Sequence, residues 1–138
     1  MINPVRLVDE LNGMLDYLPP DKFGINDDFW RHPLFRATVE TSNNRKYYLE
    51  SDLSGYPEAM PSLCVLGELQ RRDGRKLDVS SAMHCLGCRD GRTYICYLRI
   101  WRPDFHLFEL FLKGNLWLEA YEAYLQTGNP IDHYLRHQ

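Results

Sequence analysis

The stretch Asp90-Gly91-Arg92-Thr93-Tyr94-Ile95-Cys96, followed shortly by Trp101-Arg102-Pro103, decides how this chain is interpreted. An Asp-Gly pair favours a tight turn, and the residues after it favour extended backbone. The aromatic-proline sequence predicts a corner, and a helical pattern follows it. The Cys96 thiol is therefore expected on a short extended run between a turn and a corner, where it would be partly exposed.

An N-terminal helix is expected from Asn3-Pro4 onward, because asparagine is a favoured N-cap and proline suits the first helical position. Pro19-Pro20 ends it, and residues 21–33 are expected to form a loop. Apolar residues at helical spacing predict the buried face of this helix: Val8, Leu11, Leu15 and Leu18.

After Pro33 the apolar pattern changes to a period of two, which is typical of strands. Turns are expected at Ser42-Asn43-Asn44 and at Asp73-Gly74. Between and beside them lie four expected strands, centred on residues 35–39, 47–49, 62–66 and 77–79. Consecutive strands joined in this way predict a four-stranded antiparallel meander.

The remainder of the chain is expected to be helical. Asp104 is the expected N-cap of a long helix whose apolar residues follow helical spacing up to Leu125, and Gly128 and Pro130 stop it. A second short helix is expected over residues 131–137. The fold class is therefore α+β: an N-terminal helix, a four-stranded meander, a cysteine-bearing loop and C-terminal helices.

Length and composition narrow the classes of function. The 138 residues, 44% of them hydrophobic, predict a single domain spanning residues 1–138 with a real core. The net charge of −3 and the dispersed basic residues disfavour a nucleic-acid partner. No apolar run is long enough to cross a bilayer, and the N-terminus does not look like a secretory signal. Four unevenly spaced cysteines do not suggest a disulfide scaffold, so a cytoplasmic protein with reduced thiols is expected.

Cys96 taken alone favours a structural thiol, because free cysteine is among the most buried residue types. Its surroundings favour a nucleophile instead: a turn upstream, a corner downstream, and the basic residues Arg92 and Arg99. His84 is expected either to buttress its loop by hydrogen bonding or to orient groups and support an oxyanion.

The sequence His84-Cys85-Leu86-Gly87-Cys88 contains a CxxC pair. A zinc site needs four ligands and no second pair stands at matching spacing, while a redox CxxC normally opens a helix. We therefore interpret this segment as a turn, and we expect no metal. No glycine-rich phosphate loop, Ser-His-Asp set or paired-carboxylate motif is present, and we expect no cofactor.

In this order the motifs resemble those of ubiquitin-conjugating enzymes, which share the UBC-like fold. The resemblance covers roughly residues 33–126. Four features carry the resemblance, and each is similar to a family motif. Tyr56-Pro57 with Pro61 and Leu63 is similar to the motif Y-P-x-x-x-P-x-V, and His84 is similar to the histidine of H-P-N. The run from Asp90-Gly91 to Ile95-Cys96 is similar to D-G-x-I-C, and Trp101-Arg102-Pro103 is similar to W-x-P. The chain departs from the family where Cys85 and Leu86 replace the proline and asparagine of H-P-N. In the family that asparagine supports isopeptide formation, and we expect His84, Asp104, a backbone amide or another residue nearby in the fold to substitute for it.

The resemblance implies an enzyme in which Cys96 accepts a protein C-terminus as a thioester and passes it to an amine, typically a lysine, on a target.

Leu116 to Tyr121 and Thr127-Gly128 are more similar to bacterial members of the family. Stand-alone bacterial relatives occur in anti-phage operons. In CBASS systems they carry the C-terminus of a cGAS-like nucleotidyltransferase, and in other operons a ubiquitin-like protein, with or without a separate activating enzyme. Two alternatives stay open: an inactive binding module of the same fold, and a small zinc-binding interaction domain that uses Cys85 and Cys88.

Overall fold

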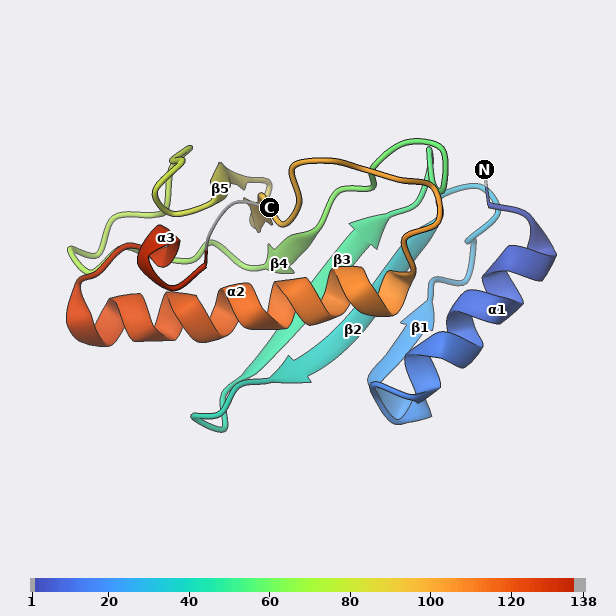
Figure 1. Cartoon of the computed structure of the whole chain (residues 1–138), viewed down its shortest axis with the longest axis horizontal. Helices are drawn as coiled ribbons and strands as arrows, with labels where there is room; N and C mark the ends of the chain where they lie inside the picture. The colour runs from blue at the N-terminus through green and yellow to red at the C-terminus, as the bar shows by residue number, and fades with distance from the viewer. Residues whose placement is uncertain (1, 136–138) are drawn as a thin grey trace.

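A computed structural model describes residues 2–135 of the chain. It is an α+β structure in which helices pack on an antiparallel six-stranded sheet of order β1-β2-β3-β4-β6-β5. Figure 1 shows α2 crossing the sheet, α1 at the β1 side and α3 beside the end of α2. The elements are α1 Pro4–Leu15, a 3₁₀ turn Pro20–Lys22, β1 Phe23–Ile25, β2 Leu34–Glu40, β3 Lys46–Asp52, β4 Cys64–Leu66, β5 Cys85–Arg89, β6 Arg92–Ile95, α2 Leu107–Thr127 and α3 Ile131–Tyr134.

The predicted start of helix α1 is confirmed, but its predicted buried face is wrong in part: Leu11 and Leu18 pack partly buried against the core, whereas Val8 and Leu15 are exposed. The Oδ1 atom of Asn3 accepts a hydrogen bond from the Arg6 amide at 2.8 Å, with proline following the cap. Val8 and Leu15 are 55% and 50% exposed, and the helix instead buries Leu7, Glu10 and Met14. A pattern of apolar residues could not predict this face, because a carboxylate lies at its centre.

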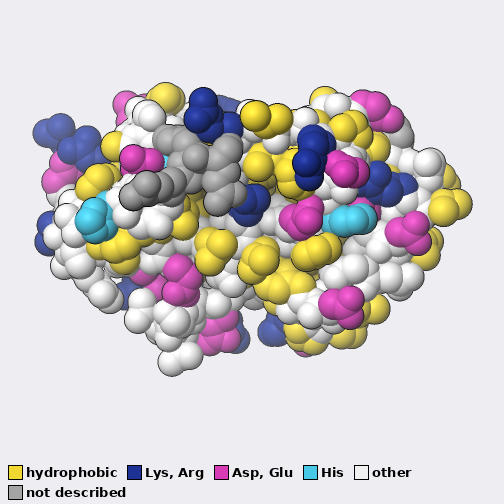
Figure 2. Space-filling view, viewed as in Figure 1, with side chains coloured by type: hydrophobic (Ala, Val, Ile, Leu, Met, Phe, Trp, Pro, Cys, Tyr) yellow, Lys and Arg dark blue, Asp and Glu magenta, His cyan; other side chains and the backbone are white. Residues whose placement is uncertain are grey.

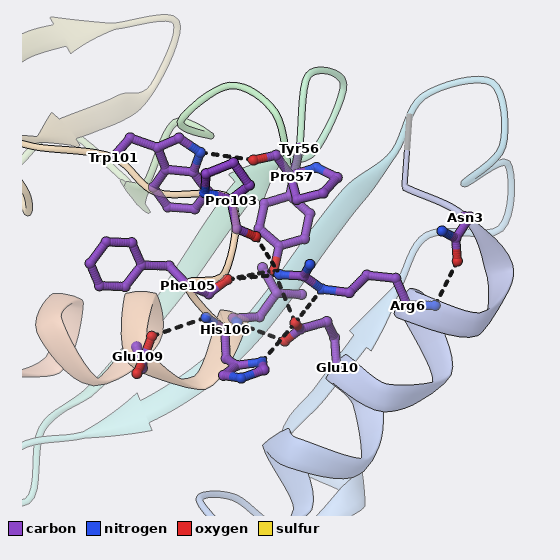
Figure 3. A network of polar contacts seen from close by, with 11 residues as sticks. Asn3, Arg6, Glu10, Tyr56, Pro57, Trp101, Pro103, Phe105, His106 and Glu109 are labelled. Carbon is purple, nitrogen blue, oxygen red and sulfur yellow. Dashed lines mark hydrogen bonds and ion pairs between the residues drawn. The ribbon is translucent and has the colours of Figure 1, made fainter.

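The Glu10 side chain is 1% exposed and is surrounded by donors (Figure 3). Its Oε1 atom accepts hydrogen bonds from Arg6 Nε at 2.8 Å and from the Tyr56 hydroxyl at 3.0 Å, and His106 Nδ1 lies 3.0 Å away. Its Oε2 atom accepts the Leu107 amide at 2.8 Å. Burial alone would raise the pKa of Glu10, but these hydrogen bonds outweigh it and hold the pKa below the ordinary value.

Arg6 extends the same network to the loop that precedes α2. Its Nη2 atom donates to the carbonyl oxygens of Pro103 at 2.9 Å and Phe105 at 3.0 Å (Figure 3). That loop begins at Cys96, so α1 holds in place the segment that leads from the thiol to the long helix.

The predicted four-stranded meander is wrong in its last strand and in its strand number. The first three expected strands form β2, β3 and β4, but the run expected over residues 77–79 is not a strand. Its place beside β4 is taken by β6, antiparallel, with Cys64 opposite Tyr94 and Leu66 opposite Arg92. The Asp73-Gly74 turn does form, but it closes only an isolated bridge between Gln70 and Lys76.

Local chemistry explains this exchange of strands. In the expected run Val79 is 70% exposed, and the Asp78 carboxylate accepts the Val79 amide rather than leaving it for a partner strand. Residues 92–95 instead alternate, with Thr93 and Ile95 buried. Asp90 and Gly91, at φ 54° and 72°, turn the chain between β5 and β6. Strand β1 lies in the segment that was expected to be a loop, and it pairs with β2.

Helix α2 begins later than predicted and ends as predicted. Its N-cap is His106, whose amide donates to the Glu109 carboxylate at 3.0 Å, so the expected cap at Asp104 is wrong. Gly128, at φ 82°, ends the helix in the left-handed region. At Gly114 a Cβ atom would meet the Leu49 side chain at 2.9 Å, so glycine permits the close approach of α2 to the sheet.

Helix α3 starts at the expected residue, Ile131, and ends at Tyr134, one turn long, because Leu135 is already extended; residues 136 and 137 of the expected helix lie outside the described residues. Among the described residues, no helix is long and apolar enough to cross a membrane.

We expect Glu10→Gln to lower the free energy of unfolding by about 3 kcal/mol, because the amide cannot accept from all four donors and leaves Arg6 without its buried carboxylate. Urea titration followed by circular dichroism measures the change. Asp9→Asn, on the exposed side of the same helix, is the matched control and should change stability by less than about 0.5 kcal/mol. Equal effects of the two substitutions would contradict the role of the network.

The lowered pKa of Glu10 also predicts a pH dependence. A carboxyl group with a depressed folded-state pKa contributes stability above its unfolded-state value, which is near 4.5, and loses it as the pH falls through the folded-state pKa. The difference in unfolding free energy between the wild type and Glu10→Gln should therefore be largest at neutral pH and shrink below about pH 4. Urea titrations between pH 7 and pH 3 test this, and a constant difference would contradict it.

Candidate functional site

Cys96 follows directly after the last residue of β6 and is half-buried. The strand is held on both sides of this point: the Ile95 amide donates to the Leu63 carbonyl at 3.0 Å, and the Cys96 amide donates to the His84 carbonyl at 2.8 Å. The sheet therefore sets the backbone position of the thiol, while the chain beyond it is released from the strand. This agrees with the sequence-based expectation of a thiol at the end of a short extended run.

The thiol lines a cavity of about 60 Å³. Four separate parts of the chain contribute to it: the residue before β5, the end of β6, one face of α2 and the residue after α3. Its lining residues are His84, Cys96, Tyr97, Lys113, Leu116, Trp117 and Leu135. Most of them come from α2 and from beyond α3, which no motif near Cys96 would indicate.

His84 is one of the two predicted site residues that meet in this cavity. Its backbone is left-handed, at φ 46°, and its side chain is 5% exposed. The ring atom Nε2 lies 2.7 Å from Oδ1 of Asp132, in α3. Asp132 was missed by sequence reasoning, because it is far from both residues in the chain and carries no motif.

Hydrogen bonds to backbone carbonyl groups attach α3 and α2 to the segment around His84. The Asp132 amide donates to the Ala82 carbonyl at 2.8 Å, and the Trp117 indole donates to the Met83 carbonyl at 3.1 Å. Ile131 is fully buried beside them. The segment that carries His84 is therefore held by two helices as well as by the sheet.

Asp104, the third residue expected at the site, does not line the cavity. Its side chain is 78% exposed and forms an ion pair with Arg102, with Nε and Oδ1 3.3 Å apart. Lys113, a charged residue of α2, does line the cavity, and sequence reasoning missed it as well. Lys113 could have been noticed only by placing α2 on the sheet first.

The loop after Cys96 joins motifs that are far apart in the sequence. The Tyr97 hydroxyl donates to the Pro61 carbonyl at 2.6 Å. The Trp101 indole donates to the Pro57 carbonyl at 2.8 Å (Figure 3). The Tyr56 and Trp101 rings pack with centroids 5.9 Å apart. Burial raises the pKa of Tyr97, so this phenol stays neutral at physiological pH.

The CxxC segment is not the turn expected from the sequence: Cys85 to Cys88 lie on β5, where a bulge falls between Cys85 and Gly87. Cys85 is buried, and its Sγ atom accepts the Gly87 amide at 3.3 Å. Cys88 is half-buried, with its Sγ atom 3.2 Å from the Thr93 hydroxyl. Within residues 2–135 no three His, Cys, Asp or Glu side chains come together as a metal site would require.

The surface around the helices carries mixed charge. On the face seen in Figure 2, the Lys and Arg side chains are scattered among acidic and apolar ones. This matches the dispersed distribution of basic residues along the sequence.

Comparison of the chain with protein-family models, with curated proteins and with solved structures gives no match.

We expect Cys96 to react with iodoacetamide at least about tenfold faster than Cys64 at pH 7.5. Cys64 is buried, and burial together with the nearby Glu50 carboxylate raises its pKa to about 12, which leaves almost no thiolate. Peptide mass spectrometry at increasing reaction times gives both rates. In Cys96→Ser the fast site should disappear, and labelling of Cys64 at the rate of Cys96 would contradict an accessible thiol.

Proposed function

We propose that this protein is a ubiquitin-conjugating-enzyme-like transferase that carries a protein C-terminus as a thioester on Cys96 and passes it to an amine. The observation that carries the proposal is the half-buried Cys96 thiol, which shares one cavity with His84 and Lys113. The same thiol ends the D-G-x-I-C-like run whose resemblance to the family is described above. The coarse order of helix, antiparallel sheet, cysteine and helix is compatible with the UBC-like fold.

The first step is a transfer between sulfur atoms. The Cys96 thiolate attacks the carbonyl carbon of an activated donor thioester, a new carbon–sulfur bond forms, and the donor's sulfur leaves as a thiolate. Such an exchange is nearly isoenergetic, so the protein needs mainly to hold the two groups in place. The position of Cys96 at the end of β6 suits this role, because the sheet orients the backbone while the side chain remains accessible.

The second step requires a group to stabilise the oxyanion formed when an amine attacks the thioester. Family members use the asparagine of H-P-N, whereas here Leu86 stands at that place, on β5 and 49% exposed. Lys113 is among the residues that line the thiol cavity, and we propose that its ammonium group stabilises the oxyanion in place of the missing amide.

The donor follows from the resemblance to bacterial members. We propose the C-terminus of a cGAS-like nucleotidyltransferase in a CBASS anti-phage system, with a ubiquitin-like protein as the other donor of the same chemistry. A lysine on a target protein is the proposed acceptor. The donor reaches Cys96 already activated as a thioester, with or without a separate activating enzyme.

Incubation with the activated donor should give a conjugate of the full chain that reducing agent removes. Cys96→Ser should convert this conjugate into a reductant-resistant oxyester, because the hydroxyl forms an ester that thiols do not cleave readily. Cys96→Ala should form none, and Cys88→Ser, which lies outside the cavity, should behave as the wild type. Non-reducing gels and intact-mass spectrometry distinguish these products.

The opposite result would favour the binding-module alternative. If Cys96→Ala retained the adduct, or if no donor loaded the wild type while partners still bound it, the assignment of Cys96 as an acyl carrier would be wrong. The cysteine at the motif position argues against that alternative, since inactive members of the family typically lose it.

A further inference from the structure

The side-chain contact between His84 and Asp132 is not needed to hold α3 in place. Helix α3 is already anchored by the Asp132 amide on the Ala82 carbonyl and by the fully buried Ile131. The Asp132 side chain makes an additional contact, with Oδ1 2.7 Å from His84 Nε2. A carboxylate at this distance orients the ring and favours the proton on Nε2.

The imidazole held in this way belongs to the thiol cavity. His84 and Cys96 both line it, and the Cys96 amide is bonded to the His84 carbonyl. Asp132 is not among the lining residues, so any influence of its carboxylate on the thiol passes mainly through the His84 ring. The arrangement is that of a thiol, an imidazole and an orienting carboxylate, brought together from β6, the residue before β5, and α3.

We propose that Asp132 is a positioning residue that holds the His84 imidazole at the Cys96 cavity, and that this ring moves the proton when an amine displaces the thiol. In this step, which rests on the proposed function, the amine nitrogen attacks the thioester carbon. A carbon–nitrogen bond forms and the carbon–sulfur bond to Cys96 breaks. The imidazole takes the proton that the amine loses and returns it to the departing thiolate, so charge and protons balance.

Other charged or titratable groups face the same cavity and enter the prediction. Lys113 contributes an ammonium group from α2, and Tyr97 contributes a phenol that burial keeps neutral. These two groups are the same in wild type and in Asp132 variants. A difference between such proteins therefore comes from Asp132, and a double-mutant cycle with His84 assigns it to their contact.

The test is the rate of Cys96 alkylation by iodoacetamide between pH 6 and pH 9, followed on the full chain by peptide mass spectrometry. Asp132→Asn keeps the shape of the side chain but removes its charge, so a protonated His84 ring beside a Cys96 thiolate loses the carboxylate that stabilises it. We expect the rate at pH 7 to fall about threefold to tenfold and the profile to move to higher pH. Asp132→Glu should restore much of the rate, and His133→Ala, the neighbouring exposed residue of α3, should match the wild type.

A double-mutant cycle separates positioning from a general effect of charge. His84→Asn suits the left-handed backbone at this position and removes the imidazole. In that background Asp132→Asn should have no further effect on the alkylation rate, because its influence passes through the ring. The proposal is overturned if Asp132→Asn overlays the wild type, moves the profile to lower pH, or slows alkylation equally without His84.

Discharge of the loaded thioester onto free lysine tests the catalytic step itself. Asp132→Asn should reach the same final extent of loading, more slowly, and should then discharge more slowly, with Asp132→Glu closer to the wild type; unchanged discharge would overturn the proton-carrying role. Alkylation uses no donor protein. A wild-type chain that never forms a thioester would therefore contradict the proposed function, while the alkylation profiles would still decide the His84–Asp132 coupling.

Discussion

The buried carboxylate of Glu10 is the interaction on which much of the remaining structure depends. Removing a carboxylate from water is costly, and it is tolerated here because four donors surround it, from α1, from the Tyr56 hydroxyl and from the start of α2. The network therefore specifies which side of α1 faces inward and where α2 begins. Through Arg6 it also holds the carbonyl groups of the loop that leads away from Cys96.

This constraint reaches the candidate site through the aromatic corner. Tyr56 packs on Trp101, and the Trp101 indole is bonded to the carbonyl of the adjoining proline, Pro57. The loop after the thiol is thereby fixed at its far end, while β6 fixes the thiol itself. Cys96 consequently sits between two rigid attachments. For the proposed thioester transfer such a frame is favourable, because less ordering is needed at the moment of reaction.

Sequence reasoning succeeded where a single local rule acts without competition. The cap at Asn3, the left-handed stop at Gly128 and the tight turn at Asp90-Gly91 all formed as expected. It failed where two segments could take the same place in the sheet. Residues 77–79 resembled a strand, yet residues 92–95, whose side chains are more deeply buried, lie beside β4. At the site, Cys96 and His84 meet in one cavity, whereas Asp104 stays in solvent and Asp132 and Lys113 were not expected.

The sequence by itself determined the α+β class, the helices at both ends and the thiol at the end of an extended run, because each depends on residues close together in the chain. Tertiary structure alone decided the strand order, the inward side of α1 and the partners of the thiol. These depend on which distant groups can satisfy one another once water is excluded. Glu10 needs donors from Tyr56 and Leu107, and His84 meets Asp132 across a long separation in sequence. No local spacing encodes such pairs, since only the packed fold brings their atoms within hydrogen-bonding distance.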